Sequence, residues 1–131
     1  MAIANLTGGG TQAQGDRDWF PGLLTTNPPD QAVLVDTAAL APGKYLAALI
    51  GYSTVAAIYD VQHRNAANTA GVNGPTGNPR TQRRAVAANL NDDWVLPNEF
   101  PIERGERLRV VLQGAIVGNI QVAIFLRVPS G

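Results

Sequence analysis

His63 is the one side chain in this sequence suited to proton transfer near neutral pH, because the chain holds a single histidine and no cysteine. Asp60 and Ser53 are the nearest residues that could complete a catalytic triad with it. On a regular strand, residues three apart point to opposite faces, so Asp60 would point away from His63. We therefore predict that His63 is a structural residue at a strand end, hydrogen-bonded to a turn, and that the protein is not an enzyme.

Paired carboxylates are the second possible source of chemistry. Asp92-Asp93, or Glu99 with Glu103, could be nominated as the two acids of a glycosidase, which must face one cleft. We interpret these acids instead as turn and surface residues. The glycine run at residues 8–10 lacks the Lys-Ser/Thr sequel of a phosphate loop, and one histidine with scattered acids matches no zinc or calcium spacing. We predict no catalytic residues, no metal and no cofactor.

The charge balance argues against nucleic acid as a partner. Ten basic and ten acidic side chains cancel, whereas nucleic-acid-binding domains are strongly basic. Nine of the ten basic residues are Arg, a bias that favours bidentate contacts with carboxylate or phosphate. Arg80, Arg83 and Arg84 form a basic cluster that we assign to a partner protein; the alternative is a solvated strand face balanced by Asp92, Asp93 and Glu99. No stretch approaches the roughly 18 apolar residues of a membrane span, so we expect no membrane contact.

The elements that position these residues are predicted to be strands. Along residues 55–64, Tyr59 and Val61 fall on one face and Asp60 on the other, the alternation of a half-buried strand. The same period of two recurs along the chain and is cleanest from Ile120 to Val128. Strands are predicted over residues 32–40, 45–53, 58–64, 80–90, 107–113 and 120–128, with shorter extended pieces at 94–97 and 100–102.

Turn-forming residues connect these strands. Pro42-Gly43 and Gly118-Asn119 are predicted to close two hairpins, Asn91–Asp93 is predicted to be a turn, and residues 65–79 a long exposed loop. About seven or eight strands at this spacing, with no room for βαβ crossovers, indicate an all-β antiparallel β-sandwich that is jelly-roll-like. We assign residues 32–131 to this domain.

Residues 1–31 differ from the rest and are predicted to form an extended N-terminal arm. Leu6–Gly15 is glycine-rich and shows neither strand nor helix periodicity. Trp19 and Phe20 stand beside Pro21-Gly22 and would pin the arm. Two interpretations stay open: these rings cover one edge of the subunit's own core, or they dock on a partner.

Two predicted strands carry apolar residues on both faces. In the 45–53 strand, Tyr45 and Leu49 lie opposite a second apolar row, and in the last strand Phe125 lies opposite the Ile, Val and Leu residues. A sandwich core covers only one face of each sheet. We therefore predict that Tyr45, Leu49 and Phe125 form the interface of a homo-oligomer.

Four short phrases carry a resemblance to a known family: Ile58–Asn68 (IYDVQHRNAAN), Arg83–Asn89 (RRAVAAN), Gly105–Val111 (GERLRVV) and Asn119–Ile124 (NIQVAI). With their strand order, they resemble the small jelly-roll decoration, or cement, proteins of tailed-bacteriophage capsids. The resemblance spans residues 32–128 and leaves the N-terminal arm outside.

The resemblance implies a structural protein that binds the major capsid protein on the outer capsid surface and stiffens the lattice. It also implies a homotrimer, made in the host cytoplasm and located on the virion. The alternative is a carbohydrate- or receptor-binding jelly roll, such as the head of a fibre, in which Trp94, Tyr59 or the 65–79 loop stacks on sugar. An exposed Trp94 would favour that alternative, while the single histidine argues against a cupin-like enzyme.

Overall fold

The computed structural model describes residues 17–74, 77 and 80–127, and this part of the chain forms strands and no helix. Within these described ranges, ten strands follow one another: β1 Arg17–Phe20, β2 Thr25–Thr26, β3 Val33–Asp36, β4 Gly43–Ser53, β5 Ala57–Arg64, β6 Thr81–Val86, β7 Asn91–Val95, β8 Phe100–Ile102, β9 Arg107–Gln113 and β10 Asn119–Arg127.

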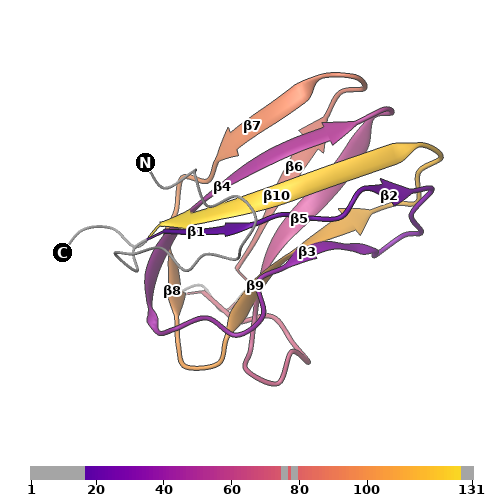
Figure 1. Ribbon diagram of the computed structural model, residues 1–131. Coiled ribbons are helices and arrows are strands. Elements are labelled where there is room, and N and C mark those ends of the chain that lie inside the picture. Colours follow the sequence, from indigo (N-terminus) through magenta and orange to yellow (C-terminus); the bar gives the residue numbers. More distant parts are fainter. Residues whose placement is uncertain (1–16, 75–76, 78–79, 128–131) are drawn as a thin grey trace.

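The strands form two antiparallel sheets that pack as a β-sandwich (Figure 1). The larger sheet has the order β1-β10-β4-β7, with β2 beside β10 and β8 beside β4, and the smaller sheet has the order β3-β9-β5-β6. The first and last of these strands, β1 and β10, are neighbours in the larger sheet. The predicted all-β sandwich is confirmed, and its strand order is that of a jelly roll.

Alternate residues of the long strands fill the space between the sheets. The most deeply buried of them include Leu49, Tyr59, Val61, Leu108, Val110, Leu112, Ile120, Val122, Ile124 and Leu126. Burial of each large side chain contributes about 1.5–3 kcal/mol. This core fixes the register of the strands, because a slip by one residue would turn every inward side chain to the outside.

The two predicted hairpins are wrong. β3 pairs with β9 in the smaller sheet, whereas β4 lies between β10 and β7 in the larger one. Between them the chain crosses the sandwich, and the N–H groups of Thr37 and Leu40 donate to the carbonyls of Leu108 and Glu106. β9 and β10 also lie in opposite sheets, despite the Gly118-Asn119 turn. A period of two identifies the buried face of a strand but not its neighbours, so consecutive strands are mistaken for hairpins.

The turn predicted at Asn91–Asp93 is also wrong, because these residues begin β7, which pairs with β4. Their polar character suits an edge strand, where one row of backbone groups faces away from the sheet. The strand predicted over 80–90 is shorter and ends at Val86.

The boundary predicted for the N-terminal arm lies too far along the chain. β1 pairs with β10 in the register Trp19↔Phe125 and Phe20↔Ile124, and Phe20 packs against the core. β2 pairs with the other end of β10. Residues 17–26 therefore contribute two strands to the sandwich. Residues 1–16 of the predicted arm, and Val128 of the predicted last strand, lie outside the described residues.

Candidate binding surfaces

His63 lies on the inner face of β5 and has no exposed surface. Its Nε2 is 2.8 Å from Oε1 of Glu106, a carboxylate that also accepts the backbone N–H of Glu103 in the turn before β9. Nδ1 is buried and has no hydrogen-bond partner in the described part of the chain, so the neutral ring carries its proton on Nε2 and donates it to Glu106. Burial lowers the pKa of His63, against the opposing effect of Glu106. An imidazole without exposed surface cannot reach a substrate.

Arg84 closes the edge of the sandwich where β6 and β7 meet. Its Nη2 donates to Oδ1 of Asp92 at 2.6 Å, and its guanidinium lies 5.6 Å from the centre of the Trp94 ring. The Tyr59 hydroxyl donates to Oδ2 of the same carboxylate at 2.8 Å. Because Tyr59 and Arg84 belong to the smaller sheet and Asp92 to the larger, this carboxylate ties the two sheets together.

The ionisation of this cluster follows from its partners. Burial, with the hydrogen bond to Asp92, raises the pKa of Tyr59. Burial alone would raise the pKa of Asp92 too, but hydrogen bonds from Arg84 and Tyr59 lower it below its usual value. Asp92 is therefore an ionised acceptor at neutral pH, between a neutral phenol and a guanidinium.

Arg83 is likewise engaged within its own subunit. Its Nε and Nη2 donate to the two carboxylate oxygens of Asp60 at 2.8 and 3.1 Å on the outer face of the smaller sheet. Two of the three arginines assigned to a partner, Arg83 and Arg84, thus pair with acids of this chain. This agrees with the alternative of a strand face balanced by acids, although the acid that pairs with Arg83 is Asp60 rather than one of the acids named for it.

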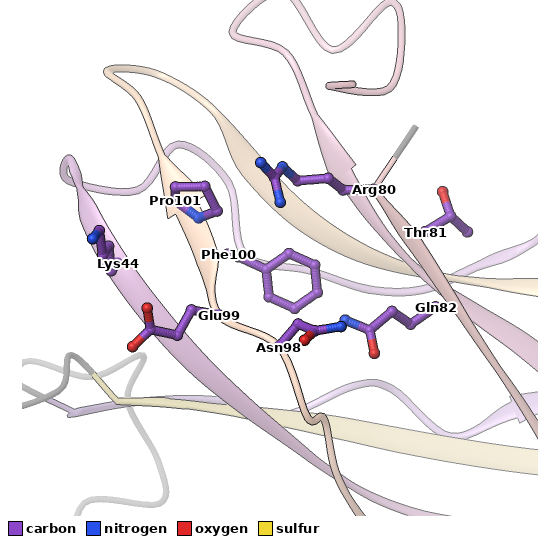
Figure 2. A pocket seen from close by; sticks show the side chains of 8 residues that line it. All are labelled: Lys44, Arg80, Thr81, Gln82, Asn98, Glu99, Phe100 and Pro101. Carbon is purple, nitrogen blue, oxygen red and sulfur yellow. The ribbon is translucent and has the colours of Figure 1, made fainter. Parts of the chain in front are cut away.

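Arg80 lies in a cleft of about 530 Å³ between the edge strands β6 and β8. Figure 2 shows the side chain of Arg80 extending toward Phe100 and Pro101, with Lys44 on the opposite side of the cleft. The Nε of Arg80 is shielded from solvent and has no hydrogen-bond partner among the described residues. Neither cation forms an ion pair within the described part of the chain. The lining of the cleft thus holds two cations, Lys44 and Arg80, and one carboxylate, Glu99, so it carries one excess positive charge for an anionic group from outside.

The outer face of the larger sheet is apolar. Strand register aligns one side chain each from β1, β10, β4 and β7 in a row across the sheet: Trp19, Phe125, Ala48 and Val95. Leu46, Ile50 and Ala123 flank this row, and we call these seven residues the apolar face. Val95 is 74% exposed and Ile50 47% exposed. Trp19 and Phe125 contact each other, with ring centroids 6.1 Å apart.

The outer face of the smaller sheet has the opposite character. It carries the Arg83–Asp60 ion pair, the Arg107–Asp36 ion pair and a hydrogen bond from Arg109 to Gln62. These charged side chains pair with one another, although Nε of Arg107 has no hydrogen-bond partner among the described residues. The two outer faces of the sandwich therefore differ in what they can bind.

The interface predicted from sequence is wrong for two of its three residues. Tyr45 and Leu49 are 5% and 0% exposed and lie in the core of the single subunit. β4 is apolar on both faces. Its alternate residues Leu46, Ala48 and Ile50 form the row that lies on the outer face of the sheet. Phe125 does lie on the outer face. Of the two rings in the arm, Phe20 packs on the subunit's own core, whereas Trp19 belongs to the apolar face.

Sequence reasoning missed Val95, Ala48 and Ile50 as surface residues and Asp92 and Glu106 as partly buried acceptors. The double apolar row of β4 was the available signal for the first group. No local signal exists for the second, because Asp92 is 33 residues from Tyr59 and Glu106 is 43 residues from His63.

Comparison with known proteins gives no match to a family model and no similar curated protein. Across the described ranges, no group of three or more His, Cys, Asp or Glu side chains is placed to hold a metal ion. No helix long and apolar enough to cross a membrane occurs in those ranges either.

Proposed function

We propose that this protein is a non-enzymatic structural subunit that decorates the outer surface of a tailed-bacteriophage capsid and stabilises its lattice. The observation that carries the proposal is the apolar face, since connected apolar surface on a folded domain marks a site of protein contact. The jelly-roll strand order and the sequence phrases that resemble capsid decoration proteins support the same role. In this proposal the protein is made in the host cytoplasm and located on the virion.

The two open surfaces of the subunit have different roles in this proposal. The apolar face holds copies of the chain together in a homo-oligomer, a trimer as the resemblance implies. The cleft binds the major capsid protein, because Lys44 and Arg80 form no ion pair among the described residues and outnumber the one acid of the lining, Glu99, so they suit a carboxylate of that partner. Arg83 and Arg84 are committed to Asp60 and Asp92, so they contribute to the fold rather than to the capsid contact.

Sugar binding is not proposed, because neither of the two rings named for stacking on sugar, Tyr59 and Trp94, has an open face. Tyr59 is 1% exposed. Trp94 packs against the core and is covered on one side by Arg84. Neither ring offers the open aromatic platform that the carbohydrate alternative requires.

The test is to mix the purified protein with capsids of its phage that lack it. We expect saturable co-sedimentation, added density on the outer capsid surface by electron microscopy, and a higher temperature of capsid rupture. Capsids that bind no protein, or that bind it without any gain in rupture temperature, would contradict the proposal. Unrelated capsids serve as the control for adsorption through the apolar face.

A further inference from the structure

We infer that copies of this chain pack head to tail through the apolar face, the β10 side of one copy against the β7 side of the next, with Arg127 of one copy meeting Asp93 of the next. The inference deepens the proposed function, on which it rests for the existence of an oligomer. It replaces the interface predicted from sequence, since Tyr45 and Leu49 lie in the core.

Continuity of the apolar face is the first argument. The row from Trp19 through Phe125 and Ala48 to Val95 spans four strands. On the central strands, β10 and β4, no charge interrupts the outward positions from Gln121 to Phe125 or from Leu46 to Tyr52. By contrast, the outer face of the smaller sheet presents ion pairs to solvent. A sheet face without such pairs is typical of surface that another protein covers.

The relief of the face fits a second copy. A shallow depression of about 200 Å³ has Ala48 in its lining, with Leu46, Val95 and Phe125 around it. A second depression of about 280 Å³ lies on the other side of the row, lined in part by Trp19, Ile50 and Tyr52. Val95 is the most exposed apolar side chain of the face. The surface thus carries both a protruding apolar side chain and recesses that can receive one.

Charge complementarity identifies the occupant as another copy of the chain. Arg127 lies on β10 beside Leu46, and Asp93 lies on β7 beside Ile50, so the charges stand at opposite sides of the apolar face. Both residues are exposed, and neither forms an ion pair within the described residues. When the β10 side of one copy meets the β7 side of the next, each Arg127 meets an Asp93. Repetition of this contact around an axis closes a ring and leaves no copy unpaired.

Sedimentation equilibrium of the full chain over a wide concentration range tests this inference without any capsid. We expect an oligomer that Val95→Asp dissociates, with the association weakened by about 100-fold or more, because the variant places an unpaired charge in an apolar contact. Val117→Asp is the matched control, since Val117 is 83% exposed in the loop before β10 and lies outside the apolar face. A persistent 13.8 kDa species, or equal effects of the two variants, would overturn the inference.

Charge reversal tests the pairing itself. Asp93→Arg and Arg127→Asp should each weaken association, and the combination of both should restore it, because the swapped pair again joins opposite charges across the interface. Failure of the combination to restore association would overturn the assigned contact. Sedimentation uses no capsids, so its result is independent of the capsid-binding test. An oligomer that fails to bind capsids in that test would contradict the capsid role alone. A monomer that binds them would contradict this inference and the proposed homo-oligomer but not the capsid role.

Discussion

Partly buried carboxylates in this protein accept hydrogen bonds from residues distant in the chain. Asp92 accepts hydrogen bonds from Tyr59 and Arg84, and Glu106 accepts one from His63. A buried charge without such partners would destabilise the fold. Three of the residues considered as possible catalysts, His63, Asp60 and Asp92, therefore have partners within the fold.

Asp92→Ala should lower the free energy of unfolding by about 1–3 kcal/mol, because it leaves the buried Tyr59 hydroxyl without its acceptor and breaks the link between the sheets. Chemical denaturation measures the change. Glu103→Ala is the control, since Glu103 is an exposed acid and surface substitutions change stability by about 0.5 kcal/mol or less. Equal losses in the two variants would show that Asp92 does not connect the sheets.

His63 should make the stability of the fold depend on pH. Burial lowers its pKa in the folded protein below the usual 6.5, so the unfolded chain binds the proton more readily. The free energy of unfolding should fall as the pH drops from about 6.5 toward the folded-state pKa, and this contribution should be flat above 6.5 and below the folded-state value.

The measurement is direct because the chain has one histidine. Its ring protons give a single NMR titration curve in the folded state and another in denaturant. We expect the folded curve to have the lower midpoint. A folded midpoint above the denatured one would mean that the hydrogen bond to Glu106 outweighs burial.

At the scale of elements, β4 connects the larger sheet, since it pairs with β10, β7 and β8. Gly51 on its inner face makes room for the cluster around Asp92, because a Cβ there would lie 3.1 Å from the Tyr59 hydroxyl. No residue with a side chain fits at Gly22, after β1, because a Cβ there would overlap the carbonyl oxygens of Val122 and Leu34. Close approach of backbones thus decides where the chain can pass from β1 to β2.

The sequence predicted which residues of β5, β9 and β10 face the core, because a period of two is a direct consequence of burial on one side. It did not predict pairing. Pro42-Gly43 looks like the centre of a hairpin turn, but Gly43 begins β4 and pairs with Ile102 of β8. The candidate surfaces could not be predicted either, because they also depend on strand pairing. Ala48 and Val95 become one surface only when β4 and β7 are known to be neighbours.

Truncation from the N-terminus should separate two roles of the first 26 residues. Deletion of residues 1–15 should leave thermal unfolding unchanged and weaken capsid attachment, as predicted for the glycine-rich arm. Deletion of residues 1–26 also removes β1 and β2, so β10 loses two neighbours and the core loses Phe20. Loss of Phe20 alone should cost about 1.5–3 kcal/mol.

Calorimetry and capsid co-sedimentation of both truncated proteins check this. If the shorter deletion already unfolds the domain, residues 1–15 belong to the core. If it leaves attachment unchanged, the arm has no role in binding.

At the scale of the whole molecule, three surfaces differ in their polarity and charge. The outer face of the smaller sheet pairs its own charges, whereas we propose that the apolar face contacts other copies and that the cleft, with Lys44, Arg80 and Glu99 in its lining, contacts the capsid. The net charge is zero, so attraction to a capsid must come from local groups rather than from the field of the whole protein.

Arg80→Gln and Lys44→Gln should each weaken capsid attachment by about five- to tenfold, the effect of losing one charged contact with a partner carboxylate. Arg104→Gln is the matched control, because Arg104 is exposed, lies outside the cleft and forms no ion pair with a described residue. Attachment of the unaltered protein should also weaken as salt concentration rises, and this dependence should be smaller in the cleft variants. Sedimentation of the free variants should show the same oligomer as the unaltered protein, because neither residue lies in the apolar face. If all three variants attach equally well, the capsid binds another surface, and the cations of the cleft have no part in attachment.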